Sequence, residues 1–164
     1  MNRILKAIFL ITVGGLVYSL IEIIARGHTH WSMIIVGGIA FFMVGLLNEY
    51  IPFEMPICAQ MIFGAAIITM VEFYSGVVIN MYLGWNAWDY SNLPFNILGQ
   101  VCLPYSILWF FIAAPAIAAD DYLRYGVYLF IERLKKKYPD NELIKNMRND
   151  KEEKPRYYLM RWEP

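Results

Sequence analysis

Four long apolar runs constrain this chain more than any other feature of its sequence. They cover residues 4–25, 32–50, 57–79 and 97–119. Each run has about twenty residues, the length that a helix rising about 1.5 Å per residue needs to cross a bilayer. With 59% hydrophobic and 17% charged residues, the chain is also far more apolar than a soluble domain. We therefore predict an all-α integral membrane protein with four transmembrane helices in residues 1–119.

The breaks between these runs are well marked. Gly27 and the three residues after it separate the first two runs, and Pro52 and Pro56 bracket the second break. The third connection, residues 81–95, is longer and rich in Trp and Tyr. Aromatic side chains of this kind lie at the level of the lipid headgroups, so this connection is predicted to be a short interfacial or re-entrant segment.

The basic residues predict the orientation in the membrane. Residues 27–119 contain no Lys or Arg, whereas eleven of the fourteen lie from Arg124 onward. Arg3 and Lys6 stand before the first run. Since Lys and Arg are retained on the cytoplasmic side, both termini are expected to be cytoplasmic. Arg26 is the exception, and Glu22 precedes it by four residues on the same helix face.

The chain changes character after Ala119. Asp120 and Asp121 suit the start of a new helix, and apolar residues then recur at helical spacing among charged ones up to residue 138. This pattern predicts an amphipathic C-terminal helix, residues 120–138, on the inner membrane surface. Residues 139–164 are predicted to form a charged cytoplasmic tail.

Two acidic residues lie inside the apolar runs. Glu22 is in the first run, and Glu72 is the only charged residue of the third. A carboxylate at membrane depth costs roughly 3 kcal/mol on insertion scales, so it usually faces a protein interior or a wet cavity. Small residues share the helix faces of both glutamates, which is typical of close helix packing in lipid, and Gly37, Gly38 and Gly45 are assigned to such packing.

The predicted topology places both glutamates in the outer half of the membrane, together with other polar residues. We therefore predict one polar pocket in the outer leaflet, covered by the segment around Trp85 and Trp88. Its charged core is Glu22, Arg26 and Glu72, and its surrounding shell is His28, His30, Asn80, Asp89, Asn96 and Gln100.

Several of these segments together resemble a known family. They are Glu22 to Ser32, Gly37-Gly38, Asn48-Glu49, Ile68 to Asn80, Trp88 to Ser91, and Asn96 to Gln100. The pattern covers most of residues 10–110. It is similar to the putative ABC-transporter type IV (CmpB-like) family of small bacterial membrane proteins. The resemblance implies a multi-span protein of the bacterial cytoplasmic membrane and a permease-like role. It assigns no functional residue.

Three functions remain open. In the first, the chain is a transporter or permease component, and Glu22 and Glu72 bind a cationic solute, a proton or a metal ion. Four spans are few for a transport pathway, and the chain has no Walker A motif. This role therefore requires a homo-oligomer or a separate membrane or ATPase subunit in addition to the lipid bilayer.

The second function is a membrane-embedded enzyme or metal site at the outer leaflet, with His28 and His30 as further ligands. The spacing of the two histidines is weak support, because such pairs are common in loops without metal, and a non-enzymatic role is favoured. The third is an assembly or sensor protein that recruits a partner through its tail. Nucleic-acid binding is not expected, since the short basic run Arg133–Lys137 suits anionic lipid. No sequence motif indicates a cofactor.

Overall fold

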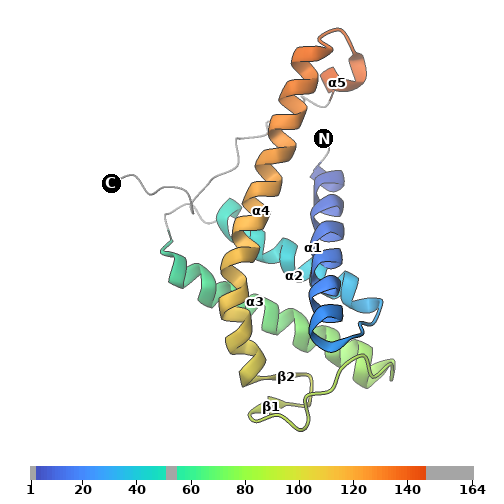
Figure 1. Cartoon of the computed structure of the whole chain (residues 1–164), viewed down its shortest axis with the longest axis vertical. Coiled ribbons are helices and arrows are strands. Elements are labelled where there is room, and N and C mark those ends of the chain that lie inside the picture. Colours follow the sequence, from blue (N-terminus) through green and yellow to red (C-terminus); the bar gives the residue numbers. More distant parts are fainter. Residues whose placement is uncertain (1–2, 51–54, 147–164) are drawn as a thin grey trace.

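The computed structural model describes residues 3–50 and 55–146, which are mostly helical (Figure 1). In chain order the elements are α1 (Arg3–Arg26), α2 (Ser32–Tyr50), α3 (Ile57–Gly76), the π-helix η1 (Val77–Tyr82), β1 (Asn96–Ile97), β2 (Val101–Cys102), α4 (Leu103–Lys137) and α5 (Glu142–Asn146). Within this part of the chain, three stretches of helix are long and apolar enough to cross a membrane: Ile4–Ile24, Ile57–Tyr82 and Leu103–Lys137. Helix α2 contributes a shorter apolar stretch, Ser32–Leu47, so the count of four crossings stays a prediction.

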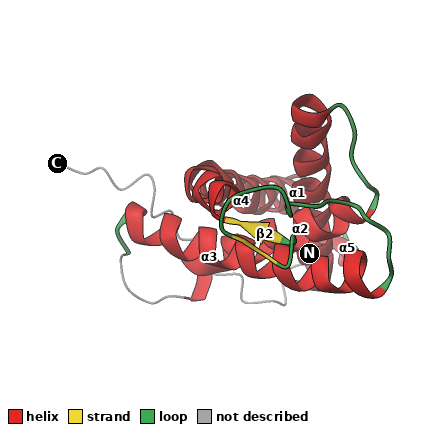
Figure 2. Ribbon diagram, turned by 90° about the horizontal axis from the view of Figure 1, so that it is seen from below, coloured by secondary structure: helices red, strands yellow, loops and turns green. Residues whose placement is uncertain are grey.

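The helices are arranged in two directions. Figure 1 shows α1 and α4 running along the length of the molecule, while α2 and α3 cross it obliquely. The start of α1 lies at the same end as α5 and the last turns of α4. The antiparallel strands β1 and β2, paired through Asn96 with Cys102 and Ile97 with Val101, lie at the opposite end. Figure 2 looks onto that end and shows the strands and their loops lying across the ends of the helices.

Paired glycines bring α1 and α2 into close contact. A Cβ atom at Gly15 would lie 2.0 Å from the backbone oxygen of Ile34, and one at Gly38 would lie 2.2 Å from that of Ile11. Neither position can therefore hold a larger residue without separating the two helices. Small residues at such a seam allow the backbones to approach in lipid, as expected for Gly38 from the sequence.

Helices α3 and α4 pack through small and apolar residues. A Cβ atom at Gly64 of α3 would lie 2.7 Å from Cβ of Ala113 on α4. Thr69 Oγ1 donates a hydrogen bond of 3.2 Å to Ser106 Oγ across the same interface. A buried cluster next to it joins three helices and consists of Ala40, Val44, Ile68, Trp109 and Ile117. This part of the core therefore lies where α2, α3 and α4 cross.

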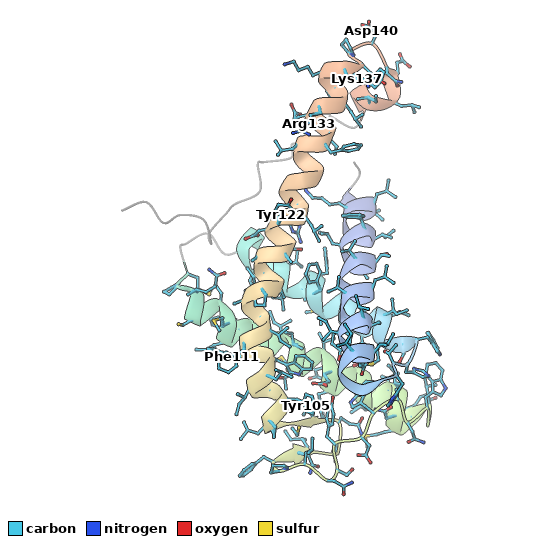
Figure 3. All side chains as sticks on the ribbon, in the orientation of Figure 1. Tyr105, Phe111, Tyr122, Arg133, Lys137 and Asp140 are labelled. Carbon is cyan, nitrogen blue, oxygen red and sulfur yellow. The ribbon has the colours of Figure 1, made fainter. Side chains whose placement is uncertain are left out.

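The fourth predicted span differs from the structure at both ends. Ile97 belongs to β1, and the helix begins at Leu103, with Pro104 in the first turn where its missing N–H costs nothing. The helix then continues for 35 residues, so the predicted break after Ala119 is absent and one helix contains the predicted surface helix. Figure 3 labels Tyr105, Phe111, Tyr122, Arg133 and Lys137 in order along it.

Packing explains why α4 does not end at the acidic pair. Asp120 and Asp121 are buried rather than capping a new helix, and Arg124 Nε donates to Asp120 Oδ2 within the same helix face. A Cβ atom at Gly45 of α2 would lie 2.1 Å from Cγ of Asp120, so α2 packs directly on this carboxylate. The contacts of Asp120 with Gly45 and Arg124 therefore keep α4 continuous at a point where the sequence pattern is typical of a helix start. Pro115 also lies inside α4.

Candidate functional site

The carboxylate of Glu72 is the centre of the candidate site. Its side chain is on α3 and is only 4% exposed. Tyr90 Oη donates a hydrogen bond of 2.9 Å to Oε1, and Trp109 Nε1 donates one of 2.8 Å to Oε2. The two donors come from the loop between η1 and β1 and from α4, respectively. A buried carboxylate is thus held by fixed donors from two separate segments, as burial of such a group requires.

Aromatic packing positions the phenol of Tyr90. Its ring is buried and stacks on Tyr105 of α4, with the centroids 4.7 Å apart and the planes 20° from parallel. The backbone N–H of Tyr90 donates to Gly99 O at 2.7 Å. Gly99 has a φ of +68°, a conformation that glycine adopts without strain. The turn at Gly99 therefore helps to direct Tyr90 toward Glu72.

A second hydrogen-bond network lies on the same loop and is centred on Gln100. Asn80 Nδ2 donates to Gln100 Oε1 at 2.8 Å, and Trp88 Nε1 donates to Gln100 O at 3.0 Å. Asn80 Oδ1 accepts a hydrogen bond of 2.7 Å from the backbone N–H of Ala87. The side chains of Asn80, Trp88 and Gln100 are all buried. This network connects the loop between η1 and β1 to Asn80 on η1.

The π-helix η1 carries Asn80 to this position. Its wider turn follows directly on α3 and changes the direction in which later side chains point. A Cβ atom at Gly76, the last residue of α3, would lie 2.5 Å from Gln100 Oε1, so the glycine leaves room for the Gln100 side chain. Such π-turns occur frequently at functional sites.

Glu22 has a different environment from Glu72. It lies near the end of α1, is 8% exposed, and accepts a hydrogen bond from Thr29 Oγ1 in the following turn. On the same turn, His30 Nδ1 lies 2.7 Å from Ser32 Oγ, and the His30 ring packs 5.7 Å from that of Trp85. His28 is exposed. The turn after α1 thus supplies a hydrogen-bond donor, Thr29, to the Glu22 carboxylate, whereas His30 is bonded to Ser32.

An aromatic pair connects the helix of Glu22 with a donor to Glu72. Tyr18 stands one helical turn before Glu22 on α1, and its ring centroid lies 6.1 Å from that of Trp109. Trp109 in turn donates to Glu72. The Tyr18–Trp109 pair therefore connects α1, which carries Glu22, with α4, which supplies a donor to Glu72.

Two other predicted residues shape the loop rather than surround a carboxylate. Asp89 is exposed, and its Oδ1 accepts hydrogen bonds from the hydroxyl and the backbone N–H of Ser91. These two hydrogen bonds lower the pKa of Asp89 below its ordinary value, and the bond from the Ser91 hydroxyl has the larger effect. Asn96 Nδ2 donates to the backbone oxygens of Ser91 and Leu93 at 3.1 and 2.8 Å. Arg26 ends α1, and its side chain lies outside the part that the structure describes.

The partners of the carboxylates are residues that the sequence analysis did not select. Tyr90, Trp109 and Thr29 donate to the two glutamates. The sequence does favour tyrosine and tryptophan in general as partners. A buried carboxylate requires hydrogen-bond donors, and these side chains combine an O–H or N–H donor with a large apolar ring. The chain has twelve Tyr and five Trp, however, and their spacing does not indicate which of them reaches Glu72.

A second buried charged group lies on α4. Asp120 is fully buried, and Asp121 and Arg124 are 3% and 6% exposed. Arg124 Nε donates to Asp120, and its guanidinium carbon lies 5.7 Å from the ring centroid of Phe42 on α2. The burial of this group was not expected, since the sequence pattern is that of a helix start at a membrane surface.

Within residues 3–50 and 55–146, no three His, Cys, Asp or Glu side chains lie close enough to hold a metal ion together. The metal-site hypothesis therefore gains no support from the described residues. The tail hypothesis depends largely on residues 147–164, which lie outside them.

Comparison with known proteins gives one match. No curated protein and no solved structure matches the chain. A family model described as "Putative ABC-transporter type IV" matches residues 7–139, which include all of α2, α3 and α4, most of α1 and the loop that carries Tyr90. The resemblance seen in the sequence motifs is thereby confirmed, and the chain belongs to this ABC-transporter-related family of membrane proteins.

Proposed function

We propose that this protein is a membrane-embedded component of a transport system and that the Glu72 site binds a cationic solute or a proton. The observation that carries the proposal is the burial of Glu72 with hydrogen bonds from Tyr90 and Trp109. A carboxylate within a membrane-crossing helix is costly, and such residues generally mark ion or substrate pathways.

The geometry of the site calls for a carboxylate. Tyr90 and Trp109 donate to different oxygens of Glu72, so a Gln would turn its NH2 group, itself a donor, toward one of them. The site therefore presents two acceptor oxygens of one acidic group, which suits the binding of a cation. Glu22, on the helix that the Tyr18–Trp109 contact joins to α4, supplies a second buried carboxylate.

The proposed topology has four crossings with both termini on the cytoplasmic side. The start of α1 and the basic end of α4, with Lys135, Lys136 and Lys137, lie at one end of the molecule, as that topology requires (Figure 1). The Glu72 site then belongs to the outer leaflet. With so few crossings, we propose that the protein works with further copies of itself or with a separate membrane or ATPase subunit.

The test is thermal stabilisation of the purified protein by cations, which needs no partner subunit. A ligand that binds only the folded state raises its stability as the free ligand concentration exceeds Kd. A panel of metal ions, amines and quaternary ammonium ions is screened against the wild type, Glu72→Gln and Glu132→Gln. The last is a matched control, because Glu132 is an exposed carboxylate paired with Lys135 on α4.

We expect at least one cation to stabilise the wild type and Glu132→Gln but not Glu72→Gln. If Glu72→Gln responds as the wild type does, or if no cation stabilises the wild type, the proposed binding of a cationic solute at Glu72 is wrong.

A further inference from the structure

The short hairpin before α4 carries large apolar side chains on its surface. It consists of β1, β2 and the turn between them, and Phe95 directly precedes it. Phe95, Ile97 and Leu98 are 79%, 58% and 61% exposed. Exposed apolar side chains that are scattered singly need no explanation, whereas a group of them marks an interaction surface. We call these three residues the hairpin tip.

Two residues of the hairpin tip have a backbone conformation that bulky residues rarely adopt. The φ angle is +54° at Phe95 and +53° at Leu98. In this left-handed region the Cβ atom of an L-residue crowds the backbone, so a large residue persists there only where the surrounding structure holds it. Glycine or asparagine would form the same turn at a lower cost. The chain therefore keeps large apolar side chains exposed at a conformational cost, which indicates a use for them at the surface.

The polar groups of the hairpin are hydrogen-bonded within the loop itself. The Asn96 side chain donates to two backbone oxygens of the loop and accepts a bond of 3.2 Å from the Gly99 N–H. The Gln100 N–H donates to Ile97 O at 3.0 Å, and Gln100 Nε2 donates to Leu98 O at 2.9 Å. Apolar surroundings require such internal bonding. A protein interface instead carries hydrogen bonds across it, so this arrangement favours lipid as the neighbour of the hairpin tip.

The hairpin is also continuous with the apolar surface of α4. Strand β2 leads directly into this helix, and residues 90–119 contain no charged residue. Leu103, Ile107 and Phe111 are 46%, 52% and 61% exposed and recur every four residues, so they form one apolar stripe along α4. In a helix that crosses a membrane, such a stripe faces hydrocarbon. The hairpin lies where this stripe begins, across the ends of the helices (Figure 2).

We propose that the hairpin tip inserts into the bilayer at the boundary between the headgroups and the hydrocarbon, beside the start of α4. In the proposed topology this is the outer leaflet. The backbone of the hairpin stays at the boundary, because irregular backbone exposed to lipid does not occur within the hydrocarbon region. The Tyr90 N–H donates to Gly99 O in the hairpin turn, so lipid contact also anchors the loop that carries Tyr90. This inference does not depend on cation binding at Glu72.

The test measures the depth of the hairpin tip with a nitroxide spin label on a single cysteine of the full-length protein. The label is attached at Leu98→Cys or at Ile97→Cys, in a chain whose two natural cysteines are replaced by Cys58→Ser and Cys102→Ala. The protein is reconstituted in vesicles of phosphatidylethanolamine and phosphatidylglycerol. Power saturation then compares the collisions of the label with oxygen, which concentrates in hydrocarbon, and with a water-soluble nickel chelate.

Two further positions provide the references for water and for hydrocarbon. Leu143→Cys is the matched control, because Leu143 is an equally apolar residue, 77% exposed, on α5 at the opposite end of the molecule (Figure 1). Ile107→Cys lies on the apolar stripe of α4 and reports the value expected in hydrocarbon. Ile97 belongs to β1 and has no positive φ, so its variant gives the answer even if Leu98→Cys alters the turn.

We expect the ratio of oxygen to nickel collisions to be several-fold higher at Leu98→Cys and Ile97→Cys than at Leu143→Cys, and to approach that of Ile107→Cys. Hairpin labels that collide with nickel as often as the Leu143→Cys label does would overturn the inference, because the tip would then lie in water. Labels that are immobilised and shielded from both reagents would overturn it as well, since a protein surface, such as a second copy of the chain, would then cover the tip.

Discussion

Trp109 Nε1 donates a 2.8 Å hydrogen bond to Oε2 of Glu72, a residue 37 positions earlier in the chain. This bond joins α4 to α3 beside an apolar cavity of about 300 Å³, which Trp109 of α4 and Ile68 of α3 both line. One tryptophan thus donates its N–H to the buried carboxylate and also lines this cavity. The stability of the molecule and the binding of a ligand at this site are therefore expected to depend on the same side chain.

Trp109→Phe should destabilise the protein by about 1–3 kcal/mol, because the carboxylate loses a donor that water cannot replace. Thermal unfolding in detergent measures the change. Trp85→Phe is the control, since Trp85 is 42% exposed and only its ring contacts with His30 and Trp31 are altered. Equal losses in the two variants would contradict the role of the Trp109 hydrogen bond.

Gly15→Ala should destabilise the protein by roughly 1–3 kcal/mol or more, because its Cβ would lie 2.0 Å from Ile34 O and force α1 away from α2. Gly126→Ala is the matched control on α4. Nothing lies within 4 Å of a Cβ atom there, and alanine favours helix over glycine by about 1 kcal/mol. Thermal unfolding should therefore move in opposite directions for the two variants. A neutral Gly15→Ala would show that the seam is looser than described.

Arg124→Met should cost about 3–5 kcal/mol, because Asp120 remains fully buried after losing its guanidinium partner. Lys135→Met provides the comparison. It breaks a more exposed ion pair with Glu132 on the same helix and should change stability by less than about 1 kcal/mol. Thermal unfolding of the two variants checks the difference. Similar small losses would mean that the Asp120–Arg124 pair adds little to the α2–α4 packing.

Acid should loosen the turn at Asp89. The pKa of Asp89 is lowered in the folded protein, first by the hydroxyl and then by the N–H of Ser91. Its stabilising effect is therefore complete above the ordinary aspartate pKa of about 3.9 and disappears as the pH falls through the lowered value. Hydrogen exchange of the Ser91 amide should accelerate, relative to its intrinsic rate, over that interval.

Asp89→Asn is the control for the acid effect. It keeps an oxygen acceptor but cannot titrate, so the protection of the Ser91 amide should no longer depend on pH in this interval. The same acid response in both proteins would assign it to another group.

Local patterns were sufficient to locate the first three helices. The first two apolar runs correspond to α1 and α2 to within one residue, and the third to α3 with part of η1. Glycine and proline end helices through their own backbone conformations, and the length of an apolar run is set by the thickness of the lipid bilayer. Both signals can therefore be read without knowledge of the fold. The burial of Glu22 and Glu72 could be predicted for the same reason, since a carboxylate in an apolar run has to leave the lipid.

The tertiary structure alone decided which groups meet. The pattern around Asp120 and Asp121 is that of a helix start, yet contact with Gly45 and the bond from Arg124 keep both residues inside α4. The donors to Glu72 come from a loop and from a helix more than fifteen residues away in sequence. Helical periodicity orders side chains around a single axis, whereas the pairing of Tyr90 and Trp109 with Glu72 depends on how separate elements cross and on the turn that directs the loop.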